Sequence, residues 1–260
     1  MSVLVLMKIT MVQARGMIDD PVSNFFKARM RINNVDSDIF VYPEMSCCGY
    51  VKEIKRQQAS KIDASVVNKL KDLSIKRNCA IICGCTRIYD EKNYNTLLFI
   101  DGNNITEHQK TILSRDGVFD EKEVFTPGNK PTIVKYKDLT IGLAMGQELY
   151  SPELFRYYAE KGADIVICIA AFTKEQMDHI DKIIPARAVE NSIYIILDNM
   201  TGNDPGVNLA GRSKFVSPDG IFIETFTEGS DVREILLDTD TLIKTKNERK
   251  LHEKANLDLN

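Results

Sequence analysis

Three short segments of the chain place ionisable side chains directly after predicted β-strands. Glu44 follows the apolar run Ile39–Tyr42, and Lys110 follows a strand and a turn. The segment Gly146–Glu148 lies between a predicted strand and a predicted helix. α/β proteins bind ligands at the carboxyl ends of their strands, and a strand-to-helix turn offers backbone N–H groups to a developing oxyanion. The segments are therefore candidates for a site, although acids and lysines after strands are also common at protein surfaces.

Short β-branched runs alternate with longer helical patterns, which favours an α/β fold. Strands are expected at Ile9–Gln13, Ile39–Tyr42, Ala80–Thr86, Asn95–Ile100, Thr140–Met145, Ile165–Ala170 and Ile193–Leu197. Helices are expected at Val22–Asn33, Lys52–Lys76, Pro152–Glu160 and Gln176–Asn191. The end of the chain is expected to be hairpin-like, with strands at Ser213–Val216, Ile221–Thr225 and Glu234–Leu237.

The length and composition favour a single domain over residues 1–260. The chain is 43% hydrophobic, which suits one large α/β core, and it shows no repeat or linker. The charged, apolar-poor stretch at about 244–260 is expected to form an extended or partner-dependent tail.

Charge, hydropathy and cysteine usage exclude several classes of function. The net charge of −3 and the scattered Lys and Arg residues predict no nucleic-acid partner, and no apolar run reaches the ~20 residues that span a bilayer. Six cysteines without a C-x-x-C pair predict no zinc site. Cys79, Cys83 and Cys85 alternate as small apolar residues on one strand face would. A reduced, cytoplasmic chain without a membrane partner is expected.

A series of short motifs runs in order along nearly the whole chain. They are Tyr42-Pro43-Glu44, Gly49-Tyr50, Tyr94-Asn95-Thr96, Lys110, Asp120–Gly128, Ser151–Arg156, Gly162-Ala163-Asp164, Arg187–Asn191, Asn199, Gly211, Ser213, Pro218 and Gly220. Together they resemble the motifs of the carbon–nitrogen hydrolase (nitrilase) family. No single motif decides the matter, but the ordered set is very specific.

The resemblance implies a fold and a set of roles. The fold would be a four-layer α-β-β-α sandwich that assembles as a homodimer or a higher even oligomer, without cofactor or metal. Family members cleave non-peptide carbon–nitrogen bonds through a cysteine thioester. By motif, Glu44 would be the general base, Lys110 the cation that stabilises the oxyanion and Glu121 a second, substrate-placing acid, with Glu123 as the competitor for that role.

The segment in which the family keeps its nucleophile departs from the family pattern. Gly142 upstream and the motif at Ser151–Arg156 downstream set the register without a gap, so Gly146 stands where the family has cysteine. Glycine has no side chain and cannot hold an acyl group. Gln147, Glu148 and Ala171 are expected to line the pocket, although Glu148 could instead hydrogen-bond backbone and Gln147 could fill space.

Two hypotheses about function follow from this departure. The first is a family member that cannot form the thioester and binds a small nitrogenous or carboxylate metabolite, as a binding or regulatory protein. The second is an active amidase or nitrilase that uses water or a relocated cysteine. Cys47, Cys48 and Cys168 are the candidates for that cysteine, although a role as small buried side chains suits each of them better. A third interpretation makes Glu44, Lys110 and Glu121 a purely structural ion-pair cluster.

Overall fold

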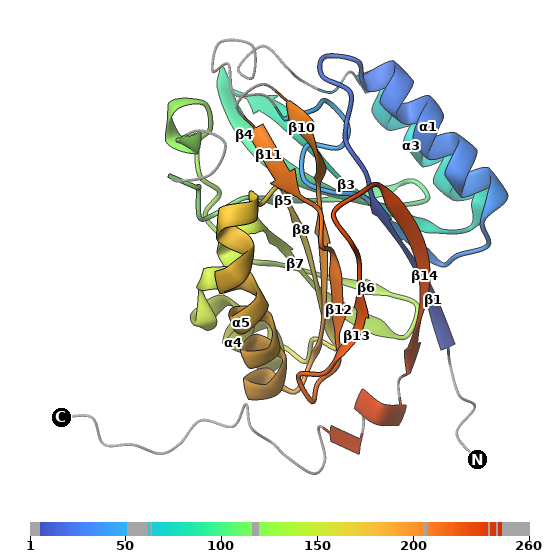
Figure 1. Ribbon diagram of the computed structural model, residues 1–260. Coiled ribbons are helices and arrows are strands. Elements are labelled where there is room, and N and C mark those ends of the chain that lie inside the picture. The colour runs from blue at the N-terminus through green and yellow to red at the C-terminus, as the bar shows by residue number, and fades with distance from the viewer. Residues whose placement is uncertain are drawn as a thin grey trace.

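The structure is a computed structural model that describes residues 6–50, 62, 64–115, 120–204, 207–238, 240–242 and 244–245 of the chain. Two six-stranded sheets pack face to face, and helices cover the outer face of each (Figure 1). The four-layer α-β-β-α sandwich implied by the resemblance is therefore confirmed.

The first sheet has the strand order β14-β1-β2-β3-β4-β5. Its strands are β1 (Leu6–Gln13), β2 (Ile39–Val41), β3 (Ala80–Tyr89), β4 (Lys92–Asp101), β5 (Asn104–Gln109) and β14 (Asp231–Asp238). The central strands β1, β2 and β3 are parallel, and the outer pairs are antiparallel. Helices α1 (Pro21–Asn34) and α3 (Ala64–Arg77) pack on its outer face.

The second sheet has the order β13-β12-β9-β8-β7-β6. Its strands are β6 (Thr132–Tyr136), β7 (Leu139–Met145), β8 (Ile165–Ala170), β9 (Tyr194–Asn199), β12 (Lys214–Val216) and β13 (Phe222–Thr225). Helices α4 (Pro152–Glu160) and α5 (Lys174–Asn191) cover it. A separate hairpin joins β10 (Thr201–Asp204) to β11 (Val207–Ala210).

Alternation along the strands creates the layers. On β7, Ile141 and Leu143 face the core between the sheets, while Ala144 faces α4 and α5. Because both faces of these strands are buried, they appear in the sequence as nearly continuous apolar runs. Cys79, Cys83 and Cys85 all lie in the core beneath α1 and α3, as their alternation predicted.

Local signals explain where the helices begin. Asp20 caps α1 by accepting a hydrogen bond from the Ser23 N–H, and Pro21 occupies the first turn. Ser151 caps α4 by accepting from the Leu154 N–H. The predicted bounds of α4 and β8 are correct to the residue.

The expected arrangement of the chain end needs correction. β12 and β13 form an antiparallel hairpin, but Glu234–Leu237 does not continue it. This segment belongs to β14, which crosses to the other sheet and pairs with β1 along its length. That pairing is long-range, so the local pattern did not show it.

Two further expectations meet the edge of the described residues. The helix expected at Lys52–Lys76 is observed from Ala64, and its first part, apart from Ile62, lies outside the described residues. The tail expected from residue 244 lies outside them from residue 246, and Lys244 and Thr245 are helical. None of the helices that the structure describes combines the length and apolar character needed to cross a bilayer.

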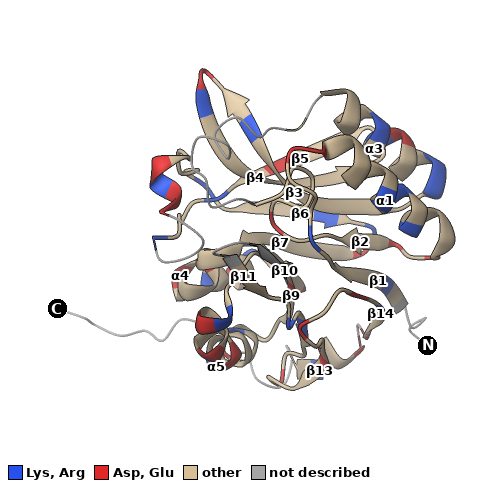
Figure 2. Ribbon diagram, turned by 45° about the horizontal axis from the view of Figure 1, so that its top comes forward, with Lys and Arg blue, Asp and Glu red and all other residues tan. Residues whose placement is uncertain are grey.

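Basic residues gather on one pair of helices. α1 and α3 carry seven Lys and Arg residues and a single acid, Asp72, so blue segments follow both helices in Figure 2. The basic residues are Lys27, Arg29, Arg31, Lys69, Lys71, Lys76 and Arg77. The sequence hides this grouping because the two helices are distant along the chain.

Candidate active site

Three strand ends bring the predicted ionisable residues together. Glu44 follows β2, Lys110 follows β5, and Gly146 follows β7 of the opposite sheet. Lys110 Nζ donates to Glu44 Oε1 at 2.8 Å and lies 3.0 Å and 2.9 Å from the two carboxylate oxygens of Glu121. All three side chains are buried, with at most 3% of each exposed. We call these residues the Lys110 cluster.

Glu121 rather than Glu123 contacts Lys110. Glu121 lies at the start of the 3₁₀ turn η1 (Glu121–Glu123), where its side chain points inward, whereas Glu123 is exposed. The motif spacing thus selected the residue that the fold buries.

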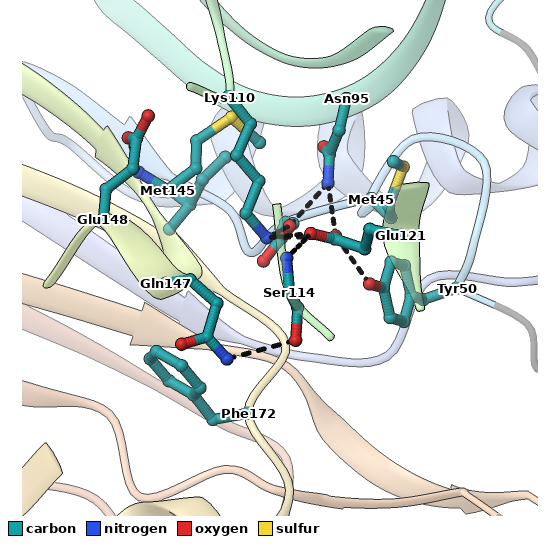
Figure 3. A network of polar contacts seen from close by, with 12 residues as sticks. Met45, Tyr50, Asn95, Lys110, Ser114, Glu121, Met145, Gln147, Glu148 and Phe172 are labelled. Carbon is teal, nitrogen blue, oxygen red and sulfur yellow. Dashed lines mark hydrogen bonds and ion pairs between the residues drawn. The ribbon is translucent and has the colours of Figure 1, made fainter. Parts of the chain in front are cut away.

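Neutral donors complete the surroundings of the two carboxylates. Asn95 Nδ2 donates to Glu44 Oε1 at 2.6 Å and to Glu121 Oε1 at 3.1 Å. The Tyr50 hydroxyl donates to Glu121 Oε1 at 2.7 Å, and the Ser114 N–H donates to Oε2 at 2.6 Å (Figure 3). Sequence reasoning gave Asn95, Tyr50 and Ser114 no role, although Tyr50 and Asn95 lie within motifs that carry the resemblance.

Burial and charge set the protonation of this cluster. Burial raises the pKa of Glu44, and the charge of Glu121 raises it further, against the lowering effect of Lys110. Burial acts to lower the pKa of Lys110, but the charges of Glu121 and Glu44 outweigh it and raise that pKa. Lys110 therefore stays a cation, while Glu44 holds its proton more tightly than an exposed carboxyl does.

Gly146 occupies a sharp turn between β7 and the 3₁₀ turn η2 (Gly146–Tyr150). Its φ of +44° is a conformation that residues with a side chain rarely adopt. A Cβ atom at this position would lie 2.9 Å from Lys110 Nζ and 3.0 Å from Glu44 Oε2. Strained strand-to-helix turns of this kind present catalytic nucleophiles in other enzymes. A side chain at position 146 would thus point directly at the Lys110 cluster.

Glu148 holds this turn against the segment that carries Lys110. Its Oε1 accepts from the Thr111 N–H and hydroxyl, both at 2.6 Å. Its Oε2 accepts from the Met145 N–H at 2.7 Å and lies 2.8 Å from His108 Nε2. Burial acts to raise the pKa of Glu148, but the His108 and Thr111 contacts outweigh it and lower that pKa. Glu148, His108 and Thr111 form what we call the Glu148 cluster.

These contacts bear on the expectation that Glu148 lines the pocket. Glu148 is fully buried and is not among the described residues that border the cavity beside Lys110. Its contacts match the structural alternative, in which the carboxylate bonds to backbone.

A small cavity adjoins the Lys110 cluster. Its volume of about 10 Å³ corresponds to a single water-sized molecule. It is bordered by Glu44, Tyr50, Lys110, Ser114, Gly146, Gln147, Ala171, Phe172 and Gln176. Gln147 Nε2 donates to Ser114 Oγ at 3.1 Å across it (Figure 3). Gln147 and Ala171, which were expected to line the pocket, both border this cavity. A larger groove, of about 400 Å³, lies between α1 and α3 and has no part in this cluster.

The cysteines considered as replacement nucleophiles are all buried, and none of them is in a disulfide. A hydrogen bond with Cys83 and burial raise the pKa of Cys47, and burial raises the pKa of Cys168. A raised pKa keeps a thiol protonated and unreactive at neutral pH. Cys48 packs its sulfur against Met45, 3.8 Å from the Met45 sulfur. Among the described residues, no group of His, Cys, Asp and Glu side chains is arranged to hold a metal ion.

Comparison with known proteins decides the family. The model of the carbon–nitrogen hydrolase family matches residues 9–247. The chain belongs to this family. It is 29% identical over 247 residues to an (R)-stereoselective amidase from Pseudomonas sp., covering 91% of this chain and 86% of that one.

Solved structures of the superfamily share the fold. Nit3 from Saccharomyces cerevisiae, of branch 10 of the nitrilase superfamily, superposes with a TM-score of 0.87 at 24% identity, over 97% of both chains. A cysteine-to-alanine mutant of the amidase from Nesterenkonia sp. AN1, in complex with butyramide, superposes with a TM-score of 0.77 at 22% identity, over 94% of this chain and 95% of that one.

Proposed function

We propose that this carbon–nitrogen hydrolase family protein binds a small nitrogenous or carboxylate metabolite without forming the thioester. Within the fold, it would act as a binding or regulatory homologue of the amidases that it resembles. Glu44, Lys110 and Glu121 would recognise the ligand rather than drive an acyl transfer.

The geometry at Gly146 carries the proposal. Glu44 Oε2 and Lys110 Nζ both approach the place of a Cβ atom at position 146 within about 3 Å. A base and an oxyanion-stabilising cation are placed as a nucleophile there would need them. Glycine offers no atom that could attack, so a covalent acyl intermediate cannot form at this position.

The remaining thiols do not replace that atom. Cys47 and Cys168 are buried with raised pKa values, and Cys168 packs in the core beneath α4 and α5. Loss of a nucleophile normally removes several orders of magnitude of rate. The alternative, hydrolysis through water or a displaced cysteine, has no observation in its favour.

A relative supports binding without turnover. The Nesterenkonia amidase was crystallised with butyramide after a cysteine had been replaced by alanine. A member of this fold can therefore hold an intact amide when it lacks a cysteine, and the proposal extends that behaviour to this chain.

Restoring the thiol tests the proposal. Wild-type protein is expected to release no ammonia above the blank from a panel that includes acetamide and butyramide. Gly146→Cys is expected to release ammonia from at least one of them, because its sulfur would meet Glu44 and Lys110 after a small shift of the Lys110 side chain. Gly146→Ala is the matched control, since it carries the same Cβ, and about the same ~1–3 kcal/mol of backbone strain, without a thiol.

Two results would contradict the proposal. Ammonia release by the wild-type protein at the rate of an ordinary amidase would show that the thioester is not needed. A folded Gly146→Cys variant without activity would show that Glu44 and Lys110 are not in working geometry.

A further inference from the structure

The groove between α1 and α3 lies on the outer side of the first sheet, away from the cavity at Gly146. Among the described residues, none borders both the groove and that cavity, so the two are separate. The groove has a volume of about 400 Å³. Sites for small molecules occupy about 300–1,000 Å³, so the groove is large enough to hold one.

Three apolar side chains line the groove. Phe25 and Leu73 are buried, with 7% and 5% exposed, whereas 44% of Phe26 is exposed to solvent. The rings of Phe25 and Phe26 lie side by side, with 5.6 Å between their centroids. An apolar group that covers such a surface is held by the hydrophobic effect. The groove therefore suits a ligand with an apolar body.

The charged residues of the lining are mostly positive. Arg29, Lys69 and Lys76 supply three positive charges, against one negative charge from Asp72, so the lining carries a net charge of +2. Within the described part of the chain, none of the three cations forms an ion pair with a carboxylate. Their positive charge is therefore available to an anion from outside the chain.

Two of these cations lie beside the aromatic rings. Arg29 Cζ lies 4.9 Å from the centroid of the Phe26 ring, and Lys69 Nζ lies 6.0 Å from that of the Phe25 ring. Contacts of a cation with a ring face are favourable and hold both cations next to the apolar surface. One ligand can thus contact the apolar surface and the positive charge together.

The surroundings of the groove strengthen the positive charge. α1 and α3 together carry seven basic residues and one acid, Asp72, as the blue segments along both helices show (Figure 2). A surface that serves only solubility usually mixes charges of both signs. A charge of one sign around a concave site instead concentrates ligands of the opposite sign there.

We infer that this groove binds a small organic anion, in which a carboxylate, sulfonate or phosphate is attached to an apolar body. The body would cover the exposed ring of Phe26, and the anionic group would lie against Arg29 and Lys69. A neutral apolar molecule would lack the charge attraction, and an inorganic anion would leave the ring uncovered. This second site does not depend on the function proposed for the cavity at Gly146.

Fluorescence titration of the full chain with anilinonaphthalenesulfonate tests the inference. Phenylnaphthylamine, which has the same rings without the sulfonate, is the matched control ligand. We expect saturable binding of one sulfonate per chain and at least about tenfold weaker binding of the neutral control. Naphthoate should displace the sulfonate, whereas sodium sulfate at equal ionic strength should not.

Charge variants assign the binding to the groove. Lys69→Glu should weaken binding of the sulfonate about tenfold, because it places a like charge beside the anion. Lys27→Glu makes the same change on an exposed lysine of α1 outside the groove, and its effect should stay within about twofold because solvent and salt screen it. Asp72→Asn removes the acid of the lining and should strengthen binding about twofold.

A second pair of variants tests the apolar contact. Phe26→Ala removes the exposed ring and should weaken binding of the sulfonate about fivefold. Met30→Ala is its control, because Met30 lies on the same helix, is 65% exposed and does not line the groove. Circular dichroism and the Tm of each variant establish that it is folded.

Three results would overturn the inference. The first is unchanged affinity for the sulfonate in folded Lys69→Glu and Phe26→Ala, because the dye would then bind elsewhere. The second is equal affinity for the sulfonate and the neutral control, because charge would then play no part. The third is binding of the protein to phosphatidylglycerol vesicles without binding of either soluble anion, which would identify a membrane surface instead.

Discussion

Two buried carboxylate clusters lie on either side of the Lys110–Thr111 peptide, and they are satisfied to different degrees. In the Glu148 cluster, each oxygen of Glu148 has two partners, supplied by Thr111, Met145 and His108. In the Lys110 cluster, Glu44 Oε2 has no donor among the described residues and faces a cavity. Complete satisfaction marks a structural device, because a buried acceptor left unpaired costs folding free energy. Under the proposed function, the cavity that Glu44 Oε2 faces is the place for a ligand.

The two sheets contribute different residues to the site. The first sheet supplies Glu44 and Lys110 from the ends of β2 and β5, and the second supplies Gly146 from the end of β7. Glu148 ties the two together, since it bonds to Met145 on β7 and to Thr111 after β5. The geometry at Gly146 therefore depends on the Glu148 cluster, whose residues are not among the described residues that border the cavity.

Removing the shared cation is expected to have the largest effect on folding. Lys110→Met would leave two buried carboxylates without their ammonium, which should lower the free energy of unfolding by about 3–5 kcal/mol. Urea denaturation at neutral pH measures this loss of stability. Lys122→Met changes an exposed lysine in the turn that carries Glu121, and its effect should stay within about 0.5 kcal/mol. Equal effects of the two variants would mean that the Lys110 cluster does not form.

Weakening the Glu148 cluster is expected to have the next largest effect on the free energy of unfolding. Glu148→Gln would place an amide opposite the Thr111 and Met145 N–H groups and remove the charge that His108 faces. The loss should be about 2–3 kcal/mol, because hydrogen bonds to charged groups are the strong ones. Glu160→Gln, at the exposed end of α4, provides the control in the same denaturation assay. A Glu148→Gln protein as stable as this control would contradict the structural role.

The smallest effect on stability is expected for Glu44→Gln, which contrasts with a larger effect for Glu121→Gln. Glu121→Gln should lower stability by about 1–3 kcal/mol, because the Ser114 N–H, the Tyr50 hydroxyl and Lys110 all donate to this carboxylate. Glu44→Gln should change stability at neutral pH by less than about 1 kcal/mol, since one of the two oxygens has no donor to lose.

The pH dependence of Glu44→Gln has a definite sign. The folded protein holds the Glu44 proton more tightly than the unfolded chain does, because the pKa is raised above its usual value of 4.5. The stabilisation is therefore complete below that value and is lost as the pH rises through the raised pKa. Glu44→Gln should gain stability relative to the wild-type protein as the pH rises from 4.5 through the raised pKa of Glu44. A loss of stability in Glu44→Gln over this pH range would mean that folding lowers the pKa of Glu44.

Much of the fold and of the site was predictable from the sequence, for identifiable reasons. β7, β8 and β9 are short apolar runs between helical patterns, so local composition alone placed them. From the sequence alone, the ordered motifs indicated that Glu44, Lys110, Glu121 and Gly146 belong to one site. The homodimer, the cytoplasmic location and the single domain stay predictions.

The remainder depended on contacts between distant segments. β14 pairs with β1 across more than 200 residues, and no local pattern specifies that partner. β10 and β11 are short strands with polar residues, which local composition did not distinguish from a loop. The hydrogen-bond partners of Glu148 could be found only from the structure, because they lie on or after strands of both sheets. The lack of a donor to Glu44 Oε2 among the described residues likewise depends on how these segments pack.

Intact-mass spectrometry of the wild-type protein, quenched with acid during incubation with an amide such as butyramide, tests the central claim most directly. The expected spectrum contains only the unmodified chain, while Gly146→Cys gains the mass of one acyl group. An acyl adduct on the folded wild-type protein, mapped by digestion to Cys47, Cys48 or Cys168, would contradict the account.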